Sequence, residues 1–351
     1  MSKMVRALLN IGLALGLLFV ALHGEAKPPA PPPTTPTCPT CPIVYVQTTT
    51  SQNRSDLMLM QADGSQKTVL LSGAKGVRHG NPSWAPDGDW IAFTSNQGGV
   101  HRLWFVRRDG AYPTPVLTPC GSASSLAWRP VPAAATGKHW LAYSANCGAW
   151  DLWAVEVDLD TVPPEVSSGP FCLTCNESSG AYDWGEPAWT GDGTHLTAVR
   201  GESPYVYSYV MFDFDANTST LENGRTIELP GLGNAYVNGD WAHSTNRLAA
   251  AVHSFDLGTD DLWWFDFDRD AGTITDSGCL TGFDDEFAYE SVQWSPGGTQ
   301  LLFWARSVEL GGGYFVSPLT GFARPAMPIL SNTRNTMFGG ADWKPNPDPE
   351  P

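Results

Sequence analysis

A short motif centred on a tryptophan recurs along the chain and limits the folds that the chain can adopt. The first copy is NPSWAPDGDWIAFTS from Asn81. Related copies are EPAWTGDGTHLTAVR from Glu186, NGDWAHSTNRLAAAV from Asn238 and SVQWSPGGTQLLFWA from Ser291. In all four copies an aliphatic residue follows the tryptophan by seven places. A fifth copy contains a six-residue insertion and a sixth stops soon after its tryptophan. There are thus six anchors, 44 to 61 residues apart: Trp84, Trp128, Trp189, Trp241, Trp294 and Trp343.

Each repeat also carries a fixed series of strand-like blocks after its tryptophan. A turn such as Pro86-Asp87-Gly88 leads into the aliphatic block, since proline and glycine supply the backbone angles of a tight hairpin. An aromatic block such as HRLWFVRRDG follows, and then a short block that often contains Leu-Thr. Four antiparallel strands in a repeat of this length are typical of a β-propeller blade. We therefore predict an all-β fold, a six-bladed β-propeller of four-stranded antiparallel blades.

The last repeat is incomplete, and its missing strands are expected at the other end of the chain. Trp343 is followed by only eight residues. The segments 43–47, 56–60 and 69–71 resemble the second, third and fourth strands of a blade. The final blade should thus combine three N-terminal strands with one C-terminal strand. This closure removes an exposed sheet edge, which would otherwise favour aggregation.

The repeat resembles that of a known propeller family. The segment WAPDGDWIAFTS is similar to the W-S-P-D-G-x-x-I-A-F-T-S repeat of TolB-type propellers, and the likeness extends over most of residues 43–343. It is strong at Trp84 and Trp294 and degenerate at Trp128 and Trp241. TolB itself carries an N-terminal α/β domain, where this chain has a proline-rich segment. The resemblance therefore implies the propeller and leaves the role of TolB itself unsupported.

The N-terminal residues predict export from the cytoplasm. Residues 1–26 combine Lys3 and Arg6 with the apolar run IGLALGLLFVAL and small residues before a cut after Ala26, which is typical of a secretory signal peptide. An uncleaved anchor is the alternative, but 12 apolar residues are fewer than the roughly 20 of a membrane span. Residues 27–42 form a proline-rich tether, residues 43–345 the propeller and residues 346–351 a disordered tail. We expect a secreted or periplasmic protein, with the bacterial envelope as its setting and no membrane span after cleavage.

The charge of the chain narrows the class of partner. Removing Lys3, Arg6 and Glu25 from the 20 basic and 36 acidic residues leaves 18 and 35, a net charge of −17. An acidic surface repels phosphates and anionic lipid headgroups, so nucleic acid and membrane surfaces are disfavoured. Cationic and neutral partners remain open, and we expect a monomer.

Seven cysteines in an exported chain predict disulfides and one leftover thiol. Cys120 and Cys147 fall in loops that emerge on one face of a blade, so they can pair. Local pairs are expected at Cys172 with Cys175 and at Cys38 with Cys41. Cys279 then stays unpaired in the fourth strand of its blade, where a small apolar side chain fits.

In a propeller, the loops that enter the innermost strands gather at one mouth of the central channel. The residues of these loops are therefore candidates for ligand binding. The fifth position before each tryptophan is aromatic or histidine in five of six repeats. The neighbouring positions add the carboxylates Asp183, Glu186 and Glu290, with Arg78 as the lone cation. Such a ring suits a peptide, a cationic side chain or a sugar. The alternative is that these rings pack between blades. The candidates are His79, Trp184, Glu186, Tyr236, Tyr289, Glu290 and Phe338. The acidic, aromatic loop 281–290 is expected at the same mouth.

The sequence favours binding over catalysis. The histidines show no metal-ligand spacing, and the two CxxC pairs could hold zinc, but an oxidising compartment favours their use as disulfide bridges. We expect no metal, no cofactor and no catalytic residue. Asp266, Asp268 and Asp270 alternate as calcium ligands do, but no glutamate occupies the twelfth position, so a hairpin turn is the better interpretation. The predicted function is a non-catalytic scaffold that presents its channel mouth to a protein, peptide or glycan. The alternative is a carbohydrate-active or other hydrolytic or lyase propeller that uses Glu186, Glu290 and His79.

Overall fold

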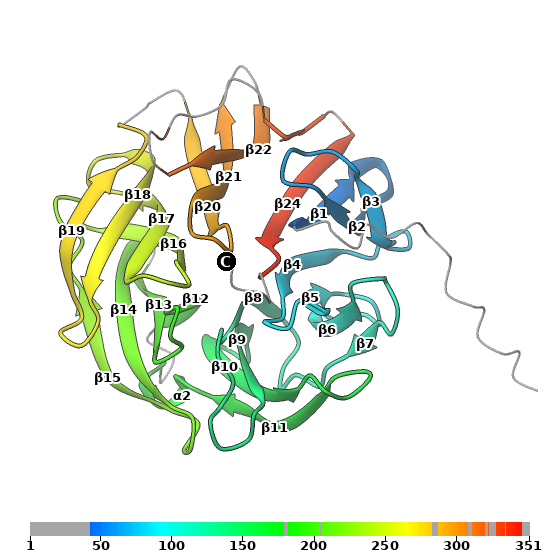
Figure 1. Cartoon of the computed structure of the whole chain (residues 1–351), viewed down its shortest axis with the longest axis horizontal. Helices are drawn as coiled ribbons and strands as arrows, with labels where there is room; N and C mark the ends of the chain where they lie inside the picture. Colours follow the sequence, from blue (N-terminus) through cyan, green and yellow to red (C-terminus); the bar gives the residue numbers. More distant parts are fainter. Residues whose placement is uncertain are drawn as a thin grey trace, which may run out of the picture. The chain divides into compact units, whose positions relative to one another are not determined.

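Six four-stranded antiparallel sheets surround a central channel in the computed structural model (Figure 1). The structure describes residues 43–178, 182–203, 205–282, 287–307, 311–319, 322, 328–333 and 335–345. The predicted six-bladed propeller is confirmed. The expected signal peptide, tether and tail lie outside the described residues. In the described part of the chain, no helix has the length and apolar character needed to cross a membrane.

We number the blades in chain order. Blade 1 contains β4 (His79–Trp84), β5 (Trp90–Ser95), β6 (Arg102–Arg107) and β7 (Thr114–Pro115). Blade 2 contains β8 (Ala123–Trp128), β9 (His139–Asn146), β10 (Trp150–Asp158) and β11 (Glu165–Cys172). Blade 3 contains β12 (Asp183–Trp189), β13 (His195–Ser203), β14 (Val206–Asp215) and β15 (Thr220–Ile227). Helix α2 (Cys175–Ser178) precedes blade 3.

Blade 4 contains β16 (Ala235–Trp241), β17 (Arg247–Ser254), β18 (Thr259–Asp268) and β19 (Thr273–Cys279). Blade 5 contains β20 (Ala288–Trp294), β21 (Gln300–Ser307), β22 (Gly311–Pro318) and β23 (Leu330–Ser331). Blade 6 contains β24 (Thr336–Trp343) with β1 (Ile43–Thr49), β2 (Arg54–Met60) and β3 (Thr68–Leu71), and the 3-10 turn η1 (Thr50–Gln52) joins β1 to β2.

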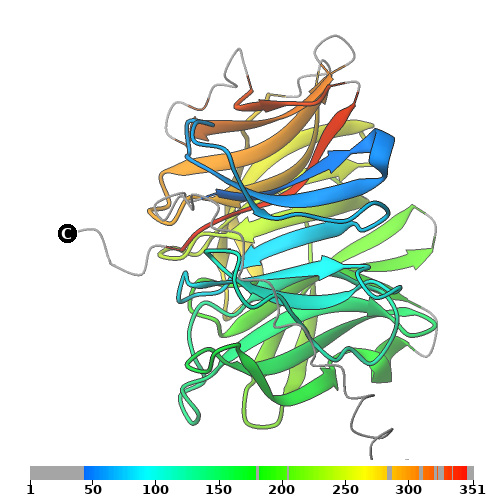
Figure 2. The ribbon, with the colours of Figure 1, turned by 90° about the vertical axis from the view of Figure 1, so that its right-hand side faces the viewer.

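Blade 6 closes the ring as the incomplete repeat predicts. The strand order is β24-β1-β2-β3, with Ile43 opposite Trp343 and Thr49 opposite Thr336. Figures 1 and 2 show the red strand β24 beside the blue strand β1. β24 is thus the innermost strand of blade 6 and pairs along its length with β1, so the two ends of the chain complete one four-stranded blade.

The core of the propeller is divided among the six interfaces between blades. Each interface holds one cluster of buried apolar side chains, and each cluster contains one anchor tryptophan. The anchor comes from the later blade of each pair: Trp128, for example, packs between blades 1 and 2, and Trp241 between blades 3 and 4. The repeated tryptophan therefore places one large buried side chain at every interface between blades.

Several of these indoles also form hydrogen bonds to the preceding blade. Trp189 Nε1 donates to the carbonyl of Ala127 at 3.1 Å, and Trp294 Nε1 donates to the carbonyl of Asp240 at 3.0 Å. Trp128 Nε1 donates to the carbonyl of Ser83 at 3.3 Å. In each case the acceptor is the residue before the preceding anchor. The indole thus satisfies a backbone group that the four-stranded sheet leaves unpaired.

Two disulfides join loops on the channel-mouth side of blades 2 and 3. Cys120 is bonded to Cys147 and Cys172 to Cys175. Cys279 at the end of β19 is free and half-buried. The expected pair of Cys38 with Cys41 lies outside the described residues.

The indole hydrogen bond can be tested by comparing two anchors. Trp189→Phe removes a donor and leaves the Ala127 carbonyl unpaired, which should lower the free energy of unfolding by about 1 to 3 kcal/mol beyond the loss of ring volume. Trp84→Phe is the matched control, since Trp84 is equally buried but its Nε1 has no partner among the described residues. Urea denaturation measures both variants. Equal destabilisation of the two would contradict this role of the hydrogen bond.

Candidate functional site

A cleft of about 480 Å³ opens at the channel mouth where blades 2, 3 and 4 meet. Its lining comes from the first residues of β8, β12 and β16, the end of β9, the start of β10 and the β13–β14 turn. Five aromatic residues contribute to it: Trp150, Tyr182, Trp184, Tyr207 and Tyr236. Three carboxylates (Asp183, Glu186 and Glu202) and four serines (Ser124, Ser125, Ser144 and Ser203) complete its polar lining.

Glu186 occupies an unusual backbone conformation in this cleft. Its φ is 48°, and β12 loses its register with β13 between Gly185 and Ala188. The equivalent residues of blades 1 and 2, Asn81 and Ser125, also have positive φ at similar breaks of register. These breaks are β-bulges, which redirect a side chain. A glutamate in the left-handed region costs of order 1 kcal/mol or more, and such residues cluster at functional sites.

The Glu186 side chain is held by neutral hydrogen-bond donors. The Tyr236 hydroxyl donates to Glu186 Oε1 at 2.8 Å, and the Ser125 hydroxyl is a second donor. The Glu186 side chain is only partly exposed, and burial raises the pKa of its carboxyl above the usual value, although these hydrogen bonds oppose the effect. Burial, together with the neighbouring Glu186 carboxylate, also raises the pKa of Tyr236. The pair therefore joins blades 3 and 4 and presents a carboxyl group of raised proton affinity to the cleft.

The structure brings together three of the seven predicted binding residues. Trp184, Glu186 and Tyr236 line the cleft. Trp184 is 1% exposed and also belongs to the core between blades 2 and 3. Its indole Nε1 has no hydrogen-bond partner among the described residues. Trp184 therefore serves mainly to pack blades 2 and 3 together beneath the cleft.

The other predicted residues lie apart from the cleft. His79 is buried, with Nδ1 3.0 Å from Ser95 Oγ, and Tyr289 is buried in the core between blades 4 and 5. Glu290 is exposed, and its Oε1 lies 2.5 Å from Arg306 Nε in an ion pair. The side chain of Phe338 and residues 283–286 of the expected acidic loop 281–290 lie outside the described residues.

Sequence reasoning missed Trp150, Tyr182 and Tyr207 in the cleft. They come from β10, from the segment before β12 and from β14, and none occupies the fifth position before an anchor tryptophan. The run Tyr205-Val206-Tyr207-Ser208-Tyr209 alternates aromatic and other residues across a turn, which was the available signal.

Trp84, Trp241 and the other anchor tryptophans contribute to a second cavity, of about 360 Å³, at the opposite end of the channel. Asp240 and Asp342 also line it, and each carboxylate ties two blades together. Asp240 Oδ2 accepts the backbone N–H of Trp294 at 2.8 Å, and Asp342 Oδ2 accepts that of Trp84 at 2.6 Å. Burial raises the pKa of each aspartate to about 7.

Asp342 predicts a pH-dependent stability. The folded chain keeps the Asp342 carboxyl protonated up to about pH 7, whereas the unfolded chain ionises it near its ordinary value. The folded state therefore binds more protons in that interval, and its stability falls as the pH rises from about 4 to 7. Asp342→Asn should raise the free energy of unfolding at pH 8 by at least about 1 kcal/mol relative to its effect at pH 4. Thermal denaturation at both pH values checks this, with Asp63→Asn as an exposed control. A shift of equal size at both values would contradict the assignment.

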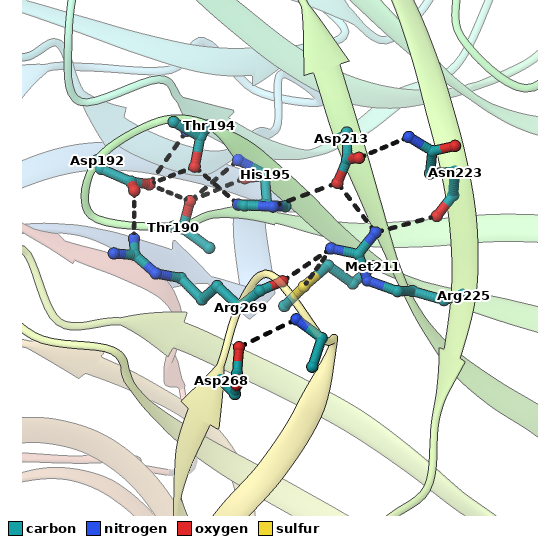
Figure 3. Close-up of polar contacts among 11 residues, drawn as sticks. Thr190, Asp192, Thr194, His195, Met211, Asp213, Asn223, Arg225, Asp268 and Arg269 are labelled. Atoms are coloured by element: carbon teal, nitrogen blue, oxygen red, sulfur yellow. Dashed lines mark hydrogen bonds and ion pairs between the residues drawn. The ribbon is translucent and has the colours of Figure 1, made fainter.

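Figure 3 shows a network of polar contacts that links blades 3 and 4 at the end of the blades where the anchor tryptophans lie. Arg269 forms an ion pair with Asp192 at 2.6 Å, and its backbone oxygen accepts a hydrogen bond from Arg225 at 2.8 Å. Asp213 contacts Arg225 at 3.0 Å and His195 at 3.2 Å. These opposite charges compensate one another within the network, so it connects the blades without presenting a free charge to a ligand.

The described residues contain one cluster whose side chains are close enough together to bind a metal ion, but two of its three members are joined in a disulfide. The ligand atoms of Asp151, Cys172 and Cys175 lie within 4.8 Å of one another, and the disulfide joins the two cysteines. The aspartates considered for calcium form the expected turn between β18 and β19. Asp268 Oδ1 accepts the N–H of Ala271 at 3.0 Å, and Asp266 is ion-paired with Arg247 at 2.6 Å.

Comparison with known proteins supports the fold. No protein-family model and no curated protein matches the chain. TolB from Acinetobacter baumannii has a similar structure, with a TM-score of 0.64 and 16% identity, over 87% of this chain and 67% of that one. A putative TolB from Agrobacterium tumefaciens gives 0.55 and 14%, over 88% and 100%. A chain of a nidogen/laminin complex gives 0.56 and 10%, over 86% and 98%.

These likenesses define the class of protein. At such identities they show the fold alone, and that fold is the TolB-like six-bladed β-propeller. The resemblance predicted from the tryptophan repeat is thus confirmed at the level of the fold.

Proposed function

We propose that this chain is an extracytoplasmic binding protein whose mouth cleft receives a protein, peptide or glycan. The observation that carries the proposal is the convergence of five aromatic residues and three carboxylates from three blades in one cleft. Aromatic faces with a few oriented polar groups are typical of recognition sites. The strained Glu186 lies within this cleft, as expected of a functional residue.

Export and partner class are parts of the same proposal. Two disulfides are typical of proteins from oxidising compartments, which agrees with the signal peptide expected in residues 1–26. The similar chain from the nidogen/laminin complex is a propeller crystallised in a protein complex, which supports a protein or peptide as one class of ligand. We propose that the mature chain begins at Lys27 and acts in the periplasm or outside the cell.

Binding is favoured over hydrolysis by the placement of the titratable groups. The enzymatic alternative needs Glu186, Glu290 and His79 to act together at one mouth. Glu186 lines the cleft, whereas Glu290 is committed to an exposed ion pair with Arg306 and His79 is buried against Ser95. The arrangement supports recognition by Glu186 and its aromatic neighbours more than acid–base catalysis by these three groups.

Array binding tests this proposal. The mature chain is labelled and applied to a peptide array and to a glycan array, beside the double variant Tyr207→Ala/Tyr236→Ala. We expect a set of peptides or glycans that the native chain binds at least about tenfold more tightly than the double variant, since loss of two aromatic faces removes several kcal/mol of contact.

The control variant is Tyr112→Ala, which removes an exposed tyrosine far from the cleft, in the β6–β7 turn of blade 1. It should bind as the native chain does, and thermal denaturation should show that all variants are folded. Binding that is unchanged in the double variant would place the site elsewhere and would refute the proposal.

A further inference from the structure

The negative charge of the residues that line the cleft favours a cationic ligand. Among the described residues, its lining holds three carboxylates and no lysine, arginine or histidine. Glu202 is ion-paired with Arg200 at 2.7 Å, and Asp183 accepts the backbone N–H of Trp150 at 3.1 Å. Among the described residues, Glu186 has only neutral hydrogen-bond partners. The cleft therefore has a partly buried carboxyl group whose charge no neighbouring cation balances, and a cationic ligand would balance it.

The aromatic residues of the cleft suit the same kind of ligand. The guanidinium of Arg200 already lies over the Tyr182 ring, with its carbon 4.9 Å from the ring centroid. Cations are attracted to the faces of tryptophan and tyrosine, and the attraction grows when the site excludes water. Tyr207 and Tyr236 pack edge to face, 5.2 Å between centroids, beside Glu186. A second ammonium or guanidinium group would thus meet both a carboxylate and ring faces.

Trp184 contributes apolar surface and not a hydrogen bond. It lines the cleft, but it is 1% exposed and its Nε1 is buried, so the indole N–H is not available to a ligand. A peptide combines a charged side chain with apolar neighbours. A neutral sugar lacks the charge, and a free amine lacks the apolar neighbours.

An exposed apolar ridge continues the aromatic lining of the cleft across the mouth face. Tyr207 stacks on Phe255 at 5.4 Å between centroids, and Tyr205 packs edge to face on Phe255 at 5.9 Å. The large side chains Tyr205, Val206 and Leu257 are 70%, 42% and 50% exposed. Tyr205 lies in the β13–β14 turn, Val206 begins β14, and Leu257 lies in the β17–β18 turn. The contacts of Phe255 with Tyr205 and Tyr207 bring the two turns together. A contiguous exposed apolar patch next to a cleft is typical of a protein-binding surface.

We propose that the cleft and the ridge together bind a peptide segment that carries a lysine or an arginine. The cationic group lies against Glu186, and an apolar neighbour of the cation packs on the ridge. This inference rests on the proposed binding function and adds the chemical class of the ligand. The net charge of −16 supports it, since an acidic chain attracts cationic partners.

The test uses four defined probes and isothermal titration calorimetry with the full mature chain. Three are capped hexapeptides with a central lysine, norleucine or glutamate between leucines, and the fourth is the neutral trisaccharide cellotriose. We expect the lysine peptide to bind at least about tenfold more tightly than the norleucine peptide at low salt, because norleucine keeps the apolar side chain and removes the charge. The preference should shrink as salt is raised.

Two pairs of variants assign that preference to residues. Glu186→Gln keeps the size of the side chain and should reduce the lysine preference to within about twofold, whereas Glu290→Gln, at an exposed site outside the cleft lining, should leave it unchanged. Leu257→Ser should weaken all three peptides, whereas Leu117→Ser, at a site 78% exposed in blade 1, should weaken none.

The outcomes separate this inference from the proposed function. Equal binding of the lysine and norleucine peptides, or binding of cellotriose alone, would overturn the cationic peptide while leaving a ligand-binding cleft in place. Failure of the lysine peptide to bind at millimolar concentration would overturn the inference as well. Failure of the proposed function is recognised separately, by array binding that the Tyr207→Ala/Tyr236→Ala variant does not change.

Discussion

The wedge that each anchor tryptophan forms between two blades is the interaction on which the rest of the structure depends. A single four-stranded sheet cannot bury both of its faces, so each blade needs neighbours. The six anchors provide one large buried side chain per interface, and four of them also donate an indole hydrogen bond to the blade before. The ring is complete only because β24 and β1 share a blade, which brings Trp343 into the interface between blades 5 and 6.

The anchor tryptophans lie at the last residues of the innermost strands, and the candidate site lies at the other end of these strands. There the backbone departs from the regular sheet pattern. The bulges three residues before Trp84, Trp128 and Trp189 turn Asn81, Ser125 and Glu186 out of the regular sheet pattern. At the first two positions the side chain is small or of a type that tolerates positive φ. At the third a glutamate is held by Tyr236 from the next blade. The same repeat that fixes the core therefore gives one blade a distinctive carboxyl group at the mouth.

The sequence predicted the fold in detail because its signal is repeated. The six tryptophans fix the number of blades, and the unfinished copy at Trp343 fixes the closure. The residues of the candidate site, by contrast, are not repeated from blade to blade, so the sequence offers no pattern from which to predict them. The fifth position before a tryptophan can direct its ring toward the channel or between blades, and linear spacing does not distinguish these directions. Tyr236 faces the cleft, Trp184 serves both, and His79 and Tyr289 are buried. Trp150 and Tyr207 reach the same cleft from outer strands, a proximity that arises only from the packing of separate blades.

The central claim is that ligands are recognised at the mouth cleft of blades 2, 3 and 4. A crystal structure of the mature chain with the bound lysine peptide tests it most directly. The account predicts electron density for the peptide across the ridge of Tyr205 and Leu257, with the lysine ammonium beside the Glu186 carboxylate. Density at the tryptophan end of the channel, or on the outer strands of the blades, would contradict it.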